Sequence, residues 1–124
     1  MIPINAPDAP KAITAYRHGN VIGNILFTAG QIGLVPETGE LVGASIDAQT
    51  EQVMKNLTAI LRAAGTDWSR VAQATVYLTD LADYAAANAV YTRMVGDARP
   101  ARSCTQVVAI PKGAKVMIEL VAEV

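Results

Sequence analysis

The end of the chain carries the pattern that most restricts how the chain can fold. In KVMIELVAEV, residues 115–124, the side chains of Val116, Ile118, Leu120 and Ala122 fall on one face of a strand, and Met117 and Val121 on the other. A strand that is apolar on both faces is expected to be buried on both. The chain is also 52% apolar and only 17% charged. We therefore expect part of its surface to be covered by copies of itself.

The rest of the chain predicts an α+β fold with the order β-β-α-β-α-β-β. Strands are expected at 16–22 and 25–33 around a Gly23-Asn24 turn, at 71–78, at 102–110 and at 115–124. Ser45 is expected to cap a first helix that ends at Gly65, and Asp80 to cap a second that ends near Val95. Helices between strand groups predict a mixed sheet with both helices on one face. Two helices then leave the second face to other subunits.

Composition excludes several classes of function for these 124 residues. The formal net charge is −1 and no basic run occurs, so there is no electrostatic footprint for nucleic acid. One cysteine excludes an intrachain disulfide, and one histidine excludes zinc motifs that need two. The N-terminal segment contains three prolines and no apolar signal core, and no apolar run reaches membrane-spanning length. The expected location is the cytoplasm.

Four residues stand where the pattern alone would place something apolar. Arg102 opens a strand, Cys104 follows it on the same side, Asn88 lies on the apolar stripe of the second helix, and Glu119 interrupts the last strand. A guanidinium can give two parallel hydrogen bonds to a carboxylate, which makes it the best single donor for one. The combination suits a small anionic substrate that is handled without a cofactor or metal.

Each of these residues also has a purely structural interpretation. Arg102 could be a surface charge at a strand end, Asn88 could bond to main chain, and Glu119 could be solvated or paired with an arginine. Cys104 could be a small buried apolar group. Four further residues also have structural interpretations: His18 as an exposed side chain, Trp68 and Tyr77 as packing residues, and Tyr16, which opens the first strand, as a residue that could simply be part of the core.

Long segments of the chain resemble one known family. FTAGQIGLVPETGEL, NLTAILRAAG, VYLTDLADYAAANAVY and above all PARSCTQVVAIPKGAKVMIELVAEV are similar to the Rid family (YjgF/YER057c/UK114). The likeness runs from about Tyr16 to the C-terminus, and it predicts that residues 1–124 form a single Rid domain. It also implies a chorismate-mutase-like fold and a homotrimer with three sites between subunits.

The resemblance implies a hydrolase that acts on C=N bonds without a cofactor. Family members that carry the arginine hydrolyse 2-enamine and 2-imine acids such as 2-aminoacrylate, 2-iminobutanoate and 2-iminopropanoate to 2-keto acids and ammonia. Pyridoxal-phosphate dehydratases release these reactive intermediates, so such enzymes are the expected functional partners. By resemblance Arg102 holds the substrate carboxylate and Glu119 acts on water, while Tyr16, Gly30, Asn88 and Cys104 complete the site.

One departure from the family pattern concerns the substrate, because Ala29 stands where members active on aminoacrylate often carry serine. Three alternatives remain open at this point. The chain could be an endoribonuclease, which its net charge and single histidine disfavour. It could be a non-catalytic trimer that binds small carboxylates, or a deaminase of a larger enamine in one particular pathway.

Overall fold

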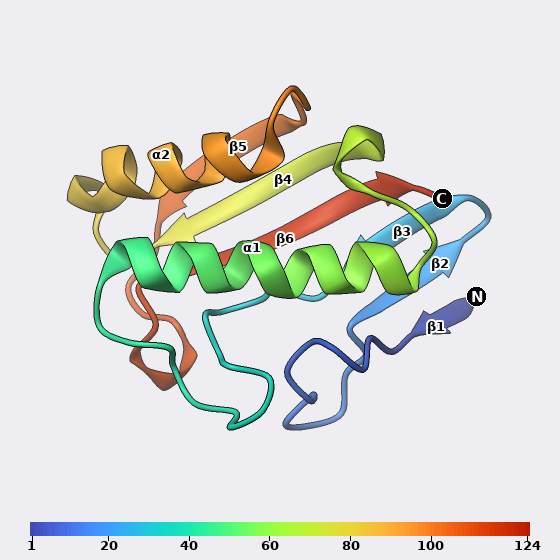
Figure 1. Cartoon of the computed structure of the whole chain (residues 1–124), viewed down its shortest axis with the longest axis horizontal. Helices are drawn as coiled ribbons and strands as arrows, with labels where there is room; N and C mark the ends of the chain where they lie inside the picture. Colours follow the sequence, from blue (N-terminus) through green and yellow to red (C-terminus); the bar gives the residue numbers. More distant parts are fainter.

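The computed structural model describes all residues from 1 to 124 and has two layers, a mixed sheet and a pair of helices that cover one of its faces (Figure 1). The six strands lie in the order β1-β2-β3-β6-β4-β5, and only β4 and β5 are parallel. Their bounds are β1 Ile2–Ile4, β2 Gly19–Ile22, β3 Ile25–Thr28, β4 Val71–Leu78, β5 Ala101–Gln106 and β6 Val116–Glu123. The predicted mixed sheet with both helices on one face is confirmed.

Local sequence signals define the ends of the long helix. Helix α1 spans Ile46–Ala63, and the Ser45 hydroxyl accepts a hydrogen bond from the Ala48 N–H at 3.1 Å. Gly65 follows the helix with φ +79°, a left-handed conformation that a glycine adopts without strain. Helix α1 therefore begins after Ser45 and ends before Gly65, as predicted.

The second helix starts later than its predicted cap suggests. The Asp80 carboxylate accepts from the Ala82 N–H at 2.9 Å and so caps a 3₁₀ turn, η2, over Leu81–Asp83. The α-helix α2 follows directly and spans Tyr84–Val95. Asp80 therefore starts the helical segment but not the α-helix itself.

The N-terminal region differs most from the prediction. The unpredicted strand β1 pairs with β2 at the edge of the sheet, where Pro3 is tolerated because an edge strand does not need every N–H. The predicted first strand is shorter than expected, and Tyr16 lies outside it, 42% exposed instead of in the core. His18 is buried, not exposed: Nδ1 accepts from the Ala6 N–H at 2.8 Å, and Nε2 lies 2.7 Å from the Pro10 carbonyl oxygen. The histidine ties the N-terminal segment to the sheet.

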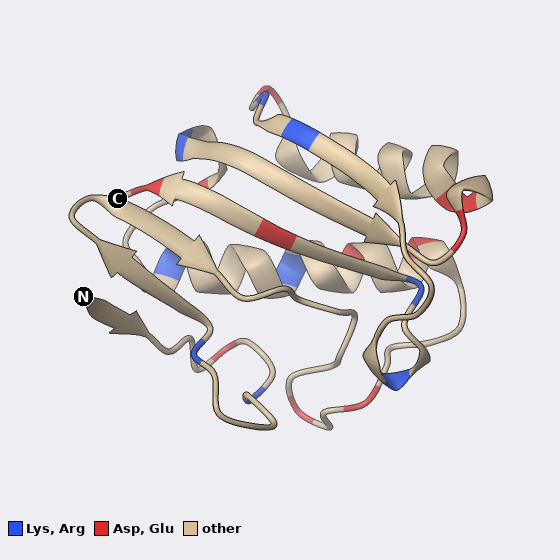
Figure 2. Ribbon diagram, turned by 180° about the vertical axis from the view of Figure 1, so that it is seen from behind, with Lys and Arg blue, Asp and Glu red and all other residues tan.

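The strand β6 lies in the middle of the sheet between β3 and β4. Its even-numbered residues are buried beneath the helices together with Leu26, Leu57 and Ile60. Its odd-numbered residues from Met117 to Val121 are half-buried and face the other side of the sheet, which no element covers (Figure 2). We call this side the open face. Its cover by another subunit stays a prediction.

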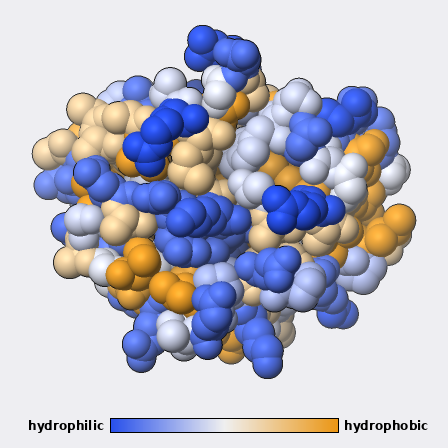
Figure 3. All heavy atoms as spheres, in the orientation of Figure 1, coloured by the Kyte–Doolittle hydropathy of each residue, from blue (hydrophilic) through white to orange (hydrophobic).

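The surface on the helix side of the sheet is mainly polar near its centre. Hydrophilic side chains dominate the middle of this side, where α1 crosses the sheet (Figure 3). Neither α1 nor α2 combines the length and the apolar content that crossing a membrane requires.

Candidate functional site

Arg102 is the second residue of β5, the strand at one edge of the sheet. In the parallel register it lies beside Ala74, and Cys104 lies beside Val76, and both neighbours on β4 are buried under the helices. Side chains beside each other on adjacent strands point to the same face. Arg102 and Cys104 are therefore half-buried beneath α2, on the same side as predicted.

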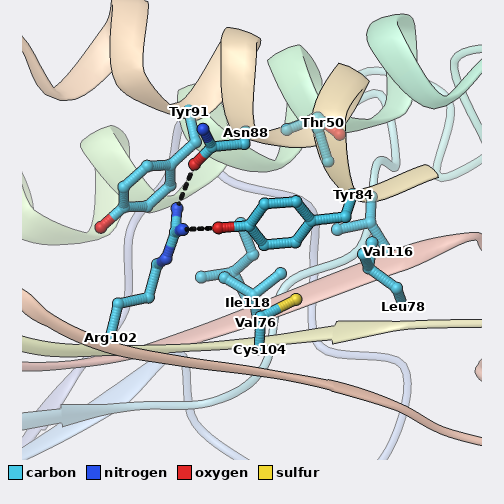
Figure 4. Close-up of a pocket in the computed structure, with 11 residues that line it drawn as sticks. Thr50, Val76, Leu78, Tyr84, Asn88, Tyr91, Arg102, Cys104, Val116 and Ile118 are labelled. Carbon is cyan, nitrogen blue, oxygen red and sulfur yellow. Dashed lines mark hydrogen bonds between the residues drawn. The ribbon is translucent and has the colours of Figure 1, made fainter. Parts of the chain in front are cut away.

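Three side chains of α2 hold the guanidinium in place (Figure 4). Arg102 Nη1 donates to Asn88 Oδ1 at 2.8 Å, and Nη2 donates to the Tyr84 hydroxyl at 2.7 Å. Its carbon Cζ lies 4.8 Å from the centre of the Tyr91 ring and 5.6 Å from that of Tyr84, a cation–π geometry. Spacings of four and three residues place Tyr84, Asn88 and Tyr91 on one face of the helix.

The charge of Arg102 has no partner. The two ion pairs of the chain, Lys55–Glu51 and Arg70–Glu123, lie elsewhere, and no carboxylate comes within 4.0 Å of this guanidinium. A guanidinium has five N–H donors, and the two hydrogen bonds to α2 leave three of them. A half-buried cation that is fixed in orientation and still has free donors is suited to bind an anion.

Space for a ligand lies on the outer side of Arg102. The apolar space beneath it, beside Cys104, measures about 10 Å³, room for roughly one water molecule. The groove outside it measures about 330 Å³ and runs between the C-terminal half of α2 and the start of β5. We call it the α2–β5 groove; its lining residues are Asn88, Tyr91, Thr92, Val95, Ala98, Arg99, Pro100 and Arg102. A small organic acid can reach Arg102 through this groove.

Two further groups beside Arg102 stay protonated at neutral pH. Burial raises the pKa of the Cys104 thiol, and the nearby Arg102 charge only partly opposes this. Burial likewise raises the pKa of Tyr91, again against the effect of Arg102, and the Tyr91 hydroxyl has no hydrogen-bond partner. A thiol with a raised pKa is a poor nucleophile, so Cys104 is not placed for covalent catalysis.

The remaining predicted site residues lie elsewhere. Tyr16 and Gly30 line a second pocket of about 320 Å³ on the open face, together with Met117. A Cβ atom at Gly30 would lie 2.7 Å from the Met117 sulfur, so only glycine fits there without a shift. Ala29, which replaces the expected serine, lines the same pocket.

Glu119 is on the open face of β6, opposite Thr75 in the register with β4. Its carboxylate accepts a hydrogen bond from the Tyr77 hydroxyl at 2.7 Å, which raises the pKa of Tyr77. Tyr77, expected as a packing residue, is therefore a polar partner of Glu119.

One chain thus brings together Arg102, Asn88 and Cys104, and separately Tyr16 and Gly30. Because β4 separates β5 from β6, Arg102 and Glu119 start from strands about 10 Å apart and point to opposite faces. Tyr84 and Tyr91 are the contacts of Arg102 that were not predicted as site residues; their helical spacing from Asn88 was the available signal. No group of three or more His, Cys, Asp or Glu residues is arranged to hold a metal ion.

Comparison with known proteins decides the family. A family model described as Endoribonuclease L-PSP matches residues 6–124, nearly the whole chain. The chain belongs to the Rid family (YjgF/YER057c/UK114). The predicted family and its fold are confirmed.

Relatives at high coverage carry different names within the family. The chain is 50% identical over 119 residues to the RutC family protein y4sK of Sinorhizobium fredii, covering 96% of this chain and 94% of the relative. It is 38% identical over 119 residues to the 2-iminobutanoate/2-iminopropanoate deaminase of Rattus norvegicus, covering 96% and 87%. Among solved structures, TdcF of E. coli with bound serine superposes with a TM-score of 0.95 at 37% identity, covering 100% of this chain and 99% of the other.

Proposed function

We propose that this protein is a hydrolytic deaminase that converts 2-enamine and 2-imine acids of the 2-aminoacrylate type to 2-keto acids and ammonia. The observation that carries the proposal is the unpaired guanidinium of Arg102, oriented by Asn88 and Tyr84 at the α2–β5 groove. The rat relative is named a deaminase of this kind, and the E. coli relative is described with bound serine, a small molecule that carries a carboxylate.

The proposed reaction starts when the enamine tautomerises to the imine, which Arg102 holds by its carboxylate. Water then adds to the imine carbon: a C–O bond forms, one water proton leaves, and the nitrogen gains a proton. Collapse of the resulting carbinolamine breaks the C–N bond, forms the C=O bond of the keto acid and releases ammonia. Glu119 takes the proton from water and returns one to the departing nitrogen, and the main-chain carbonyl of Cys104 helps to hold the water or the imine nitrogen.

The opposite directions of Arg102 and Glu119 support a site that is shared between copies. We propose a homotrimer in which the edge strand β5 of one subunit meets the open face of the next. This arrangement would bring the Arg102 side of one copy to the Tyr16, Gly30 and Glu119 side of another. It would also cover apolar groups of the open face, such as Phe27, which is 47% exposed in the single chain.

The experiment couples the protein to a threonine or serine dehydratase and follows keto-acid formation in a buffer that slows spontaneous imine hydrolysis. We expect Arg102→Ala to lower the acceleration about 100-fold or more, as for loss of one partner of a desolvated charge pair. Arg93→Ala is the matched control, because Arg93 is an exposed arginine of α2, the helix above Arg102, and lies outside the groove. If Arg102→Ala forms intact trimers and accelerates imine hydrolysis as much as the unmodified protein does, the proposal is refuted.

Two further measurements test the non-catalytic and the ribonuclease alternatives. Binding of 2-ketobutyrate without acceleration of imine hydrolysis would indicate a carboxylate-binding trimer. Cleavage of RNA by a highly purified sample in the presence of a magnesium chelator would indicate an endoribonuclease, the activity in the family model's description. Against that activity, both ring nitrogens of His18 are engaged in the protein interior.

A further inference from the structure

The α2–β5 groove contains a second arginine that the proposed reaction does not use. Arg99 lines the groove together with Arg102, and no aspartate or glutamate lines it. Asp97, the acidic residue closest to Arg99 in the sequence, is outside the lining. Neither arginine has a carboxylate within 4.0 Å, since both ion pairs of the chain lie elsewhere.

The two arginines differ in how they are held. Arg102 is half-buried and hydrogen-bonded to Asn88 and Tyr84, whereas Arg99, in the segment that leads into β5, is exposed. Three residues of extended chain span roughly 10 Å, so both side chains can reach a ligand that lies in the groove between them. Two like charges that line one groove repel each other, and an anion that contacts both removes that repulsion.

We infer that the substrate of this protein carries a second carboxylate, and that Arg99 is the residue that selects for it. This inference rests on the proposed function and names its substrate class: imines of four- or five-carbon amino dicarboxylic acids. Arg102 holds the carboxylate next to the imine carbon, and Arg99 binds the carboxylate at the far end of the substrate. The groove volume of about 330 Å³ accommodates a molecule of this size.

The test compares two substrates and two variants. The monocarboxylic imine is 2-iminobutanoate from threonine dehydratase, and the dicarboxylic imine is the product of a glutamate-oxidising amino-acid oxidase. We expect Arg99→Ala to lower kcat/KM for the dicarboxylic imine about tenfold or more, the effect of losing one charge-assisted hydrogen-bonded pair, and to change the monocarboxylic value by less than about twofold. Arg93→Ala should change neither.

Calorimetry gives a readout that does not depend on catalysis. The products 2-oxoglutarate and 2-oxobutanoate are titrated into the unmodified protein, Arg99→Ala and Arg93→Ala. We expect tighter binding of 2-oxoglutarate, and loss of that preference in Arg99→Ala alone. The preference should also weaken with added salt, because Arg99 is exposed.

The outcomes separate this inference from the proposed function. If Arg102-dependent hydrolysis is observed but Arg99→Ala affects both substrates equally or neither, the inference is wrong and the proposed function stands. If no imine is hydrolysed, the proposed function fails, and the binding preference alone decides whether Arg99 recognises a second carboxylate.

Discussion

The two sides of the sheet present two halves of the candidate site, and they differ in how complete each one is. On the helix side, Arg102 has its polar partners Asn88 and Tyr84 within the same chain. On the open face, Glu119 has one partner, Tyr77, in a layer that nothing covers. The proposed anion-binding half is therefore organised by the fold of one chain, whereas the proposed acid–base half lies on a face that no element of the same chain covers.

The largest effect on activity should come from placing substitutions of Arg102 and Glu119 in different copies of the chain. If each site takes Arg102 from one copy and Glu119 from another, Arg102→Ala and Glu119→Gln should both be inactive alone. Co-expression should restore active sites, because some interfaces then combine an intact arginine with an intact glutamate. For equal mixing in a ring of heterologous interfaces, about a quarter of the sites should recover. The measurement is imine hydrolysis by purified mixed trimers.

The control for this experiment is each variant co-expressed with itself under a second tag, which should remain inactive. Mixed trimers that show no more activity than these controls would place both residues of a working site in one chain. The proposal that each site combines residues of two copies would then be wrong.

A smaller effect on activity is expected from the hydrogen bond between Tyr77 and Glu119 on the open face. Tyr77→Phe removes the hydroxyl that Glu119 accepts from, so kcat should fall by on the order of fivefold, equivalent to a hydrogen bond of about 1 kcal/mol. The KM should change little, because the proposed mechanism assigns substrate binding to Arg102. A change in KM alone would contradict a positioning role for Tyr77.

The same variant should change stability at alkaline pH. The hydrogen bond to Glu119 raises the pKa of Tyr77 above its ordinary value of 10.0. This contribution to stability is therefore fully present below the ordinary pKa and is lost as the pH rises through the folded pKa. The free energy of unfolding should accordingly decline less steeply in Tyr77→Phe over that alkaline range, as measured by denaturant unfolding.

The smallest effect should come from the thiol beneath Arg102. Cys104→Ala removes a half-buried side chain whose raised pKa keeps it protonated, and it leaves the main-chain carbonyl in place. Activity should remain within about twofold, because in the proposed mechanism the positioned groups and not the thiol supply the catalysis. A loss as large as that of Arg102→Ala would give the sulfur a direct part in the reaction.

Local patterns predicted most of the fold. The predicted bounds 71–78 match those of β4, although a register shift between Val71 and Gln73 breaks the alternation at its start and leaves Ala72 exposed. Ser45 and Gly65 marked the ends of α1. These signals depend only on neighbouring residues, so they can be read before the fold is known. The strand β1 was missed because its pairing with β2 outweighs a proline-rich composition.

The candidate site could be predicted only in part. That Arg102 and Cys104 share a side follows from strand periodicity. The pairing of Arg102 with Tyr84, the burial of His18 and the groove that Arg99 lines depend on contacts between segments that are separated in the sequence. Residue type and spacing do not determine such contacts.

The order of the elements after β1 and the two-sided apolar pattern of the last strand could be predicted from the sequence, because periodicity and residue type are local properties. The opposite orientations of Glu119 and Arg102, and the contact between α2 and the guanidinium, became known only from the three-dimensional arrangement of the chain. The physical reason is that strand order, register and the choice of helix above β5 result from packing of the whole chain.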